Sequence, residues 1–125
     1  MIPAAAGLVL SIASIGCGHP VQRQLEGRWF GESIENFAPG ELSAATGWAR
    51  GLSFEFSGAA LTVAIPAEEP RTGAYRVTSV NHSDVRLAVD RKDGKKDTLR
   101  LKLDDDRSLR WMLDETRAIV LRREE

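Results

Sequence analysis

The chain has 125 residues, of which 42% are hydrophobic and 28% charged, a composition typical of one globular domain. Its formal net charge of −1 argues against a nucleic-acid-binding protein, because such proteins usually carry a basic excess. The single cysteine excludes an intramolecular disulfide bond and a zinc site built from cysteines.

The N-terminal stretch of the chain differs from the rest, because residues 1–16 carry no charged side chain. Residues 4–15 form an apolar run that is shorter than the about 20 residues needed to span a bilayer but suits the apolar region of a secretory signal. The run ends in Ser14-Ile15-Gly16-Cys17, which resembles the lipobox of bacterial lipoproteins. The resemblance implies that residues 1–16 are a lipoprotein signal peptide, that Cys17 is acylated, and that residues 17–25 are the lipidated N-terminus and a tether.

The residue after the cysteine is Gly18 and not Asp, which favours the outer membrane by resemblance to lipoprotein sorting in enterobacteria. The alternative is a buried N-terminal strand or helix with a structural cysteine, since a lone cysteine is commonly a small core residue. We expect a protein of the bacterial cell envelope with a lipid anchor on Cys17 in the outer membrane, facing the periplasm or the cell surface.

From residue 28 onward, apolar and polar residues alternate with period two, which is typical of half-buried antiparallel strands. Eight such segments follow one another at the spacing common in sandwiches and barrels: 28–37, 52–56, 61–65, 75–78, 85–90, 99–103, 109–113 and 117–123. We therefore predict an all-β domain over residues 26–125, a single eight-stranded antiparallel up-and-down barrel. Only residues 39–47 differ, and there we expect a loop with one helical turn before Trp48.

Two hairpin turns fix the expected strand register. Gly58-Ala59 suits a two-residue type II′ turn with glycine first, and it places Phe56 opposite Leu61. In the second hairpin, a three-residue loop over residues 92–94, with Gly94 in the left-handed region, places Leu87 opposite Leu99. A two-residue loop there would instead pair Leu87 with Arg100. The apolar side chains of the two strands would then point to opposite faces of the sheet.

Candidate catalytic or metal-binding residues are few. His82 falls in a predicted turn and His19 follows the cysteine, and neither has a partner set by spacing. The acidic run 104–106 lacks the downstream residues of a calcium loop and suits a hairpin tip. The basic run 91–96 could touch phosphates or lipid headgroups, but we interpret it as a solvated hairpin end. We expect neither an enzyme nor a cofactor.

The segment Leu25-Glu26-Gly27-Arg28-Trp29 opens the predicted barrel. Gly-x-Trp at the start of a first strand, an eight-strand meander and an arginine in the last strand resemble the lipocalin-like calycin barrels over residues 25–123. The resemblance implies that Trp29 closes the barrel floor under an arginine of the last strand. Arg122 and Arg123 point to opposite faces, and we choose Arg123 because that register buries the larger side chains. The implied ligand-facing interior comprises Phe54, Phe56, Tyr75, Leu87, Leu101 and Trp111.

The opening Leu-x-Gly-x-Trp is also similar to barrel-type bacterial inhibitors of secreted metalloproteases, although those carry a disulfide bond that this chain cannot form. We therefore predict a non-enzymatic envelope lipoprotein with a lipocalin-like barrel that binds a lipid or small apolar ligand. The alternative is a protein-binding module, either an envelope-assembly factor or a protease inhibitor. No nucleic-acid partner is expected.

Overall fold

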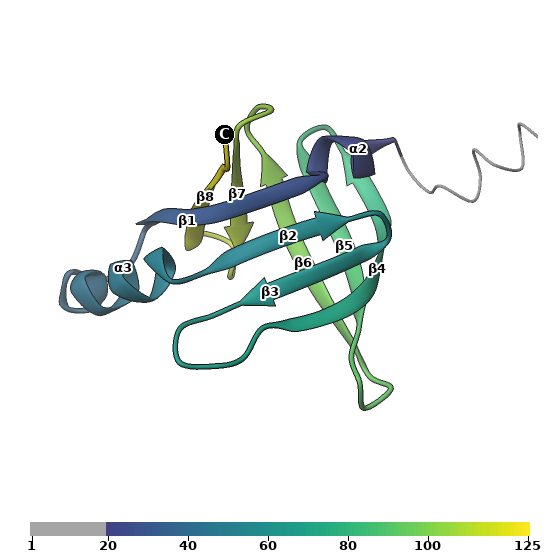
Figure 1. The fold of residues 1–125 in the computed structure, drawn as a ribbon. Helices are drawn as coiled ribbons and strands as arrows, with labels where there is room; N and C mark the ends of the chain where they lie inside the picture. The colour runs from purple at the N-terminus through teal and green to yellow at the C-terminus, as the bar shows by residue number, and fades with distance from the viewer. Residues whose placement is uncertain (1–19) are drawn as a thin grey trace, which may run out of the picture.

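The computed structural model describes residues 20–125 of the chain (Figure 1). The expected signal peptide, the expected acylation site Cys17, and His19 lie outside the described residues. Within them, none of the helices has the length and apolar character that crossing a bilayer requires.

The described residues form a closed barrel in which each strand pairs with the next in antiparallel fashion and the last pairs with the first (Figure 1). The predicted all-β class and the eight-stranded up-and-down topology are therefore confirmed. The strands are β1 (Gly27–Glu35), β2 (Ser53–Ser57), β3 (Ala60–Ala64), β4 (Arg71–Asn81), β5 (Asp84–Asp90), β6 (Lys96–Leu103), β7 (Ser108–Met112) and β8 (Ala118–Arg123). Three short helices accompany them: α2 (Val21–Leu25), the 3-10 helix η1 (Pro39–Glu41) and α3 (Leu42–Arg50).

The hairpins have the predicted registers. Gly58 has a φ of +59°, and Phe56 lies opposite Leu61. In the β5–β6 hairpin Gly94 has a φ of +85°, and Leu87 lies opposite Leu99. The sequence pattern thus identified both turns, because glycine adopts positive φ values at the lowest cost.

The segment between β1 and β2 differs from the expectation of a loop with one helical turn. It contains the nine-residue helix α3, which packs against β1 at Gly31. A Cβ atom on Gly31 would lie 1.8 Å from the carbonyl oxygen of Ala49, and the Gly31 amide donates to the Leu52 carbonyl at 2.9 Å. The missing side chain of Gly31 lets the helix approach the sheet, and burial of Ala49 stabilises the longer helix.

The N-terminal boundary of the folded part also differs from the expectation. Residues 17–25 were expected to be a tether, but Val21–Leu25 form the helix α2, and Val21 and Leu25 are buried in the core. The packed domain therefore begins no later than Val21, because these two apolar side chains gain by burial under the barrel.

Candidate functional site

The two ends of the barrel are built differently. In an up-and-down meander successive turns alternate between the ends, so the β2–β3, β4–β5 and β6–β7 turns lie at one end with α2. The other end carries α3, the β3–β4 loop, the β5–β6 hairpin and the β7–β8 turn (Figure 1). We call the end with α2 the closed end and the other the open end.

The closed end is held by Trp29 and Arg123. The guanidinium carbon of Arg123 lies 4.2 Å from the centroid of the Trp29 ring, and the Trp29 indole Nε1 donates to the Leu25 carbonyl at 2.8 Å. The Arg123 guanidinium also donates to the carbonyls of Gln24 and Glu26, which belong to the end of α2. The contact predicted between Trp29 and Arg123 is therefore present.

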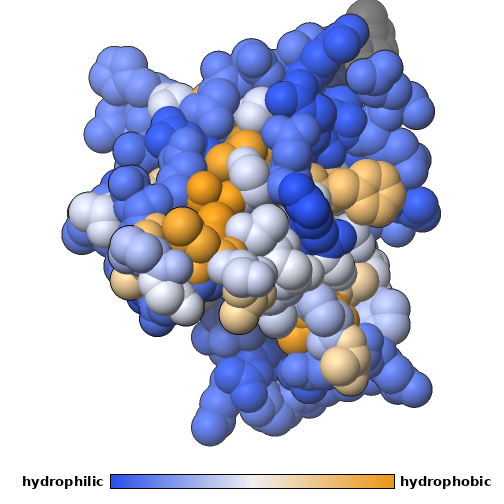
Figure 2. Space-filling model, turned by 90° about the vertical axis from the view of Figure 1, so that its left-hand side faces the viewer, coloured by the Kyte–Doolittle hydropathy of each residue, from blue (hydrophilic) through white to orange (hydrophobic). Residues whose placement is uncertain are grey.

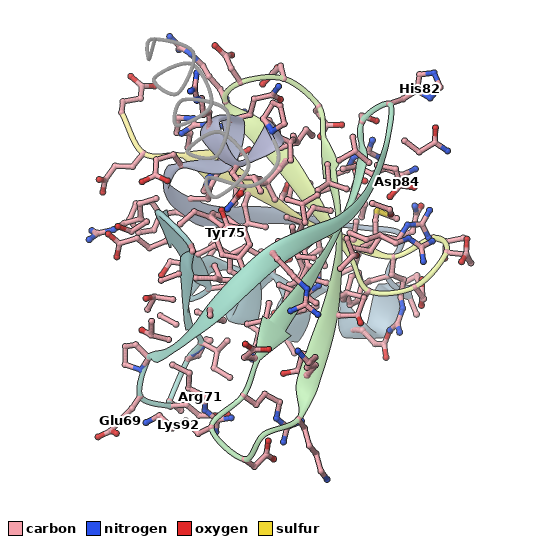
Figure 3. All side chains as sticks on the ribbon, turned by 90° about the vertical axis from the view of Figure 1, so that its right-hand side faces the viewer. Glu69, Arg71, Tyr75, His82, Asp84 and Lys92 are labelled. Atoms are coloured by element: carbon pink, nitrogen blue, oxygen red, sulfur yellow. The ribbon has the colours of Figure 1, made fainter. Side chains whose placement is uncertain are left out.

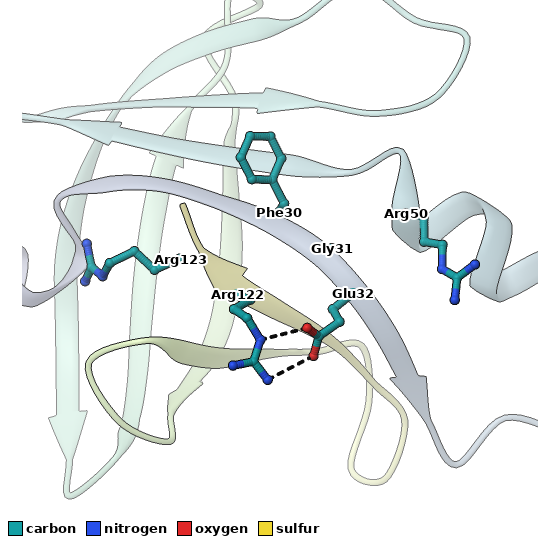
Figure 4. Close-up of a pocket in the computed structure, with 6 residues that line it drawn as sticks. All are labelled: Phe30, Gly31, Glu32, Arg50, Arg122 and Arg123. Atoms are coloured by element: carbon teal, nitrogen blue, oxygen red, sulfur yellow. Dashed lines mark hydrogen bonds and ion pairs between the residues drawn. The ribbon is translucent and has the colours of Figure 1, made fainter. Parts of the chain in front are cut away.

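Its neighbour Arg122 points to the outside of the barrel. The Arg122 Nε donates to a Glu32 carboxylate oxygen at 2.7 Å, on the outer surface of β1 and β8 (Figure 4). This ion pair borders a surface depression of about 400 Å³ that Phe30 and Arg50 also line. Because an ion pair already spans this exposed depression, we do not treat it as the candidate site.

Further contacts at the closed end fix α2. Gly27 has a φ of +118°, and a Cβ atom there would lie 2.9 Å from the Arg123 Nη1. The Glu26 carboxylate accepts from the Gly58 amide in the β2–β3 turn at 3.1 Å. The closed end therefore joins α2, β1, β8 and the β2–β3 turn in one hydrogen-bonded unit.

Five of the six predicted ligand-facing residues lie in the packed interior. Phe54, Phe56, Tyr75, Leu87 and Leu101 are all at most 4% exposed. The rings of Phe56 and Tyr75 meet edge to face with centroids 5.3 Å apart. These side chains are part of the hydrophobic core. A ligand could enter this part of the barrel only by displacing them.

The hydroxyl of Tyr75 is a buried polar group near the closed end. It makes no hydrogen bond of good geometry to any group among residues 20–125. Burial raises the pKa of Tyr75, while the Gln22 amide nearby acts in the opposite direction. The hydroxyl therefore stays protonated and faces the underside of α2.

The sixth residue, Trp111, belongs to a cleft at the open end. Trp111 is half-buried, and its ring centroid lies 6.3 Å from that of Trp48 on α3 and 5.5 Å from that of Phe54. The cleft has a volume of about 1080 Å³. Its apolar lining comes from α3 and from four strands or their ends, β3, β5, β6 and β7: Trp48, Leu61, Val63, Ile65, Val89, Leu99 and Trp111.

The apolar lining is surrounded by charged residues of the β3–β4 loop and the β5–β6 hairpin. Figure 2 shows apolar side chains gathered in the middle of the face that carries α3, with hydrophilic side chains around them. Glu69, Arg71 and Lys92 lie together at this end of the barrel, whereas Tyr75 lies farther toward the closed end (Figure 3). The open end thus combines an apolar floor with a polar rim.

Most rim charges are already paired. Arg71 lies 3.2 Å from the Glu68 carboxylate, and Arg91 lies 2.9 Å from Asp93 and 3.4 Å from Asp97. Glu69 and Lys92, in contrast, have no ion-pair partner within residues 20–125. A bound molecule with a polar end could therefore use these two charges without breaking an existing pair.

The remaining sequence candidates form no site. His82 is exposed in the β4–β5 turn with a φ of +59°, and its Nδ1 lies 2.9 Å from the Asn81 side-chain oxygen. Asp104 pairs with Arg110 at 2.9 Å, and Asp105 accepts from the Arg107 amide. The described part of the chain contains no group of three or more His, Cys, Asp or Glu placed to hold a metal ion.

Comparison of the chain with protein-family models, with curated proteins and with solved structures finds no match. The site therefore has to be interpreted from its own geometry.

Sequence analysis did not identify the rim of the cleft. Arg71 and Asp97 occupy positions of the same parity as the buried Tyr75 and Leu101 on their strands, and Arg91, directly after β5, continues the parity of Leu87. Side chains at alternate positions share one face of the sheet. Charged residues at inward positions near strand ends are therefore the signal that could have located the open end.

Proposed function

We propose that the chain is a non-enzymatic lipoprotein of the bacterial envelope, anchored in the outer membrane through Cys17. Its lipocalin-like barrel would bind a lipid or a small apolar ligand. The observation that carries the proposal is the open-end cleft of about 1080 Å³ with an apolar floor. Sites for small molecules and cofactors have about 300–1,000 Å³ and a mostly apolar lining with few polar groups, which this cleft resembles.

The geometry favours a ligand with an apolar body and one polar end. The body would lie on Val63, Val89 and Leu99, where each buried methylene contributes about 0.8 kcal/mol. The rings of Trp48 and Trp111, with centroids 6.3 Å apart and planes at 38°, offer an apolar wall. The polar end would remain at the rim, near Glu69 and Lys92.

The lipocalin-like assignment is supported by the closed end. The meander of eight strands and the Arg123 guanidinium 4.2 Å from the Trp29 ring centroid are the features that the resemblance implies. The stack joins the first strand to the last, as expected of a barrel that is closed at one end only.

The ligand site can be tested by titrating the full chain with cis-parinaric acid, a fluorescent fatty acid that accepts energy from tryptophan. We expect saturable binding that Val89→Asp weakens at least about tenfold, because the new carboxylate lies in the apolar floor. The matched control is Val80→Asp, since Val80 is 37% exposed and lies on the strand end next to the β4–β5 turn, at the closed end. Equal binding by both variants and the wild type would refute the site.

A second variant protects this test against misfolding of Val89→Asp. Trp48 is 36% exposed, so Trp48→Ala should leave the thermal unfolding curve nearly unchanged. It should nevertheless weaken probe binding and reduce the energy transfer. Unchanged binding by a folded Trp48→Ala would place the probe outside the cleft.

The anchor is tested separately. The wild-type protein should partition into detergent and incorporate a palmitate analogue in a bacterial host, and Cys17→Ser should do neither. Labelling that survives in Cys17→Ser would contradict the lipoprotein assignment.

Exposed apolar side chains favour the second candidate, a protein-binding module. Five large apolar residues are between 36% and 45% exposed within residues 20–125: Phe30, Leu42, Trp48, Val80 and Leu113. Native mass spectrometry of the protein purified from its own host distinguishes the candidates. A small-molecule adduct supports ligand binding, whereas a stoichiometric protein complex without an adduct supports a protein partner.

A further inference from the structure

The outer surface of β4, β5 and β6 carries a group of cations that we call the basic face: Arg76, Arg86, Arg100 and Lys102. Arg86 lies between the buried Val85 and Leu87, so its side chain points outward. The β5–β6 register places Arg86 directly opposite Arg100 and Asp84 opposite Lys102. In Figure 3, β4 crosses the front of the view from Arg71 to His82 and forms one side of this face.

The basic face is incompletely neutralised. The Arg100 guanidinium lies 3.1 Å from Asp84 and 3.4 Å from Glu115. Arg76, Arg86 and Lys102 have no ion-pair partner within residues 20–125. Like charges directly opposite each other on neighbouring strands destabilise a sheet, so the Arg86–Arg100 pair works against folding.

The β1–β8 side of the barrel is different, because its arginines have carboxylates nearby. Arg28 lies 3.7 Å from Glu55 and 3.6 Å from Glu124, and Arg122 lies 2.7 Å from Glu32. Arg76, Arg86 and Lys102 thus lie together on the outside of β4–β6 without carboxylate partners among residues 20–125, although the chain as a whole has a net charge of −1.

The electrostatics around Asp84 agree with this placement. The hydrogen bond from Arg100 holds the pKa of Asp84 below its ordinary value, and the charges of Arg100, Lys102 and Arg86 act in the same direction. These cations are thus close enough to act on one carboxylate. Asp84 and Glu115 together offset only part of the charge of four cations.

We propose that the basic face docks on a bilayer surface that carries anionic headgroups. The inference rests on the proposed function, because an anchor on Cys17 would hold the barrel within reach of a membrane. Each lysine or arginine near an anionic surface adds roughly fivefold to membrane affinity, and the strands present several on one side. Docking on this face lays the barrel on its side, with the β3–β4 loop and the β5–β6 hairpin, which border the cleft, next to the headgroups.

Vesicle co-sedimentation tests the proposal. The full chain carrying Cys17→Ser, which cannot be acylated, is mixed with vesicles of phosphatidylcholine alone or with phosphatidylglycerol added. We expect phosphatidylglycerol to increase binding, and we expect salt to reduce the increase, because exposed charges are screened beyond about 10 Å at 0.1 M salt. Binding that does not respond to phosphatidylglycerol would overturn the inference.

Two charge-reversal variants with the same net charge separate the basic face from general electrostatics. The first is Arg76→Glu, Arg86→Glu and Lys102→Glu, which should lose at least about tenfold in affinity for the anionic vesicles. The control is Arg23→Glu, Arg50→Glu and Arg107→Glu, at three exposed arginines elsewhere on the molecule, and it should change affinity less than about threefold. Equal losses in both variants would show that net charge alone decides binding.

Folding and ligand binding are checked in the same samples. If the first variant fails to fold by circular dichroism, the milder Arg76→Gln, Arg86→Gln and Lys102→Gln replaces it, and its binding decides the outcome. Stronger binding to heparin than to the anionic vesicles would make the occupant an acidic polymer and overturn the inference. Binding of cis-parinaric acid without binding to the anionic vesicles would refute the docking surface alone. Binding to the anionic vesicles without binding of cis-parinaric acid would refute the ligand site alone.

Discussion

Arg123 is expected to stabilise the barrel more than its neighbour Arg122, because, of these two adjacent arginines in β8, Arg123 is the one that contacts the closed end. Its guanidinium lies 4.2 Å from the Trp29 ring centroid, donates to the carbonyls of Gln24 and Glu26, and its Nε donates to the Asp106 carbonyl at 2.7 Å. Arg123→Ala removes the stack and these bonds together.

The magnitude follows from the interactions that are lost. A cation–π stack contributes about 0.5–2 kcal/mol. Hydrogen bonds from a charged donor contribute about 1.5–3 kcal/mol when buried, and less here because water can reach the freed carbonyls. We expect Arg123→Ala to lower the free energy of unfolding by about 2–4 kcal/mol, which for a domain of this size lowers the Tm by roughly 10–25 °C.

Urea unfolding followed by tryptophan fluorescence measures this loss. Arg122→Ala is the matched control, since it removes the neighbouring guanidinium, whose ion-pair partner within residues 20–125 is the exposed carboxylate of Glu32. Arg123→Lys should recover less than half of the loss, because an ammonium cannot contact several carbonyls and the ring as the planar fork does. A loss in Arg122→Ala equal to that in Arg123→Ala would refute the role assigned to the closed end.

Further substitutions test the turn, the helix and the charge network. Gly94→Val should destabilise by about 1–2 kcal/mol because φ is positive there, and Gly94→Asn by much less; equal tolerance in thermal melts would contradict the loop assignment. Gly31→Ala should lower the free energy of unfolding by about 2–3 kcal/mol, because the new methyl group clashes with α3. Gly47 lies in α3 with open space around it, so Gly47→Ala should raise the free energy of unfolding by about 0.5–1 kcal/mol. Urea titration measures both values, and a Gly47→Ala variant less stable than Gly31→Ala would contradict this packing. Hydrogen bonds from the backbone amide of Arg117, and then from its side chain, hold the pKa of Asp114 below its usual range. The contribution of Asp114 to the free energy of unfolding is therefore present above about pH 4 and is lost as the pH falls further. Asp114→Asn should reduce the loss of stability at acid pH, and an unchanged loss would count against this network.

Sequence reasoning predicted the strands and turns well because their determinants are local. Phe54 and Phe56 alternate with half-exposed residues in β2, and such alternation is fixed by the pleat of a strand. The same period-two argument selects Arg123 over Arg122, and Arg123 is the arginine that stacks on Trp29. Gly58 and Gly94 marked their turns through the φ values that only glycine readily adopts.

The cleft could not be predicted in the same way. Alternation tells which side chains point inward, but it does not tell how far along the barrel axis they lie. Phe54 and Trp111 both point inward, yet Phe54 is fully buried and Trp111 lines the open cleft. The length of α3 was missed for a similar reason, because it depends on contact with Gly31 in a distant strand.

The pairing of β1 with β8 has a consequence for how the chain folds. Ile34 lies opposite Ile119 and Glu35 opposite Ala118, so the ring closes only when the two ends of the domain meet. Contacts of such large sequence separation slow folding, because the entropy of closing a long loop is lost before the contact forms. We expect ring closure to be the slow step, and β8 is also the last strand to leave the ribosome. Until it docks, β1 and β7 each expose an unpaired edge that can join another chain, and a protein exported across a membrane would need to be shielded during that interval.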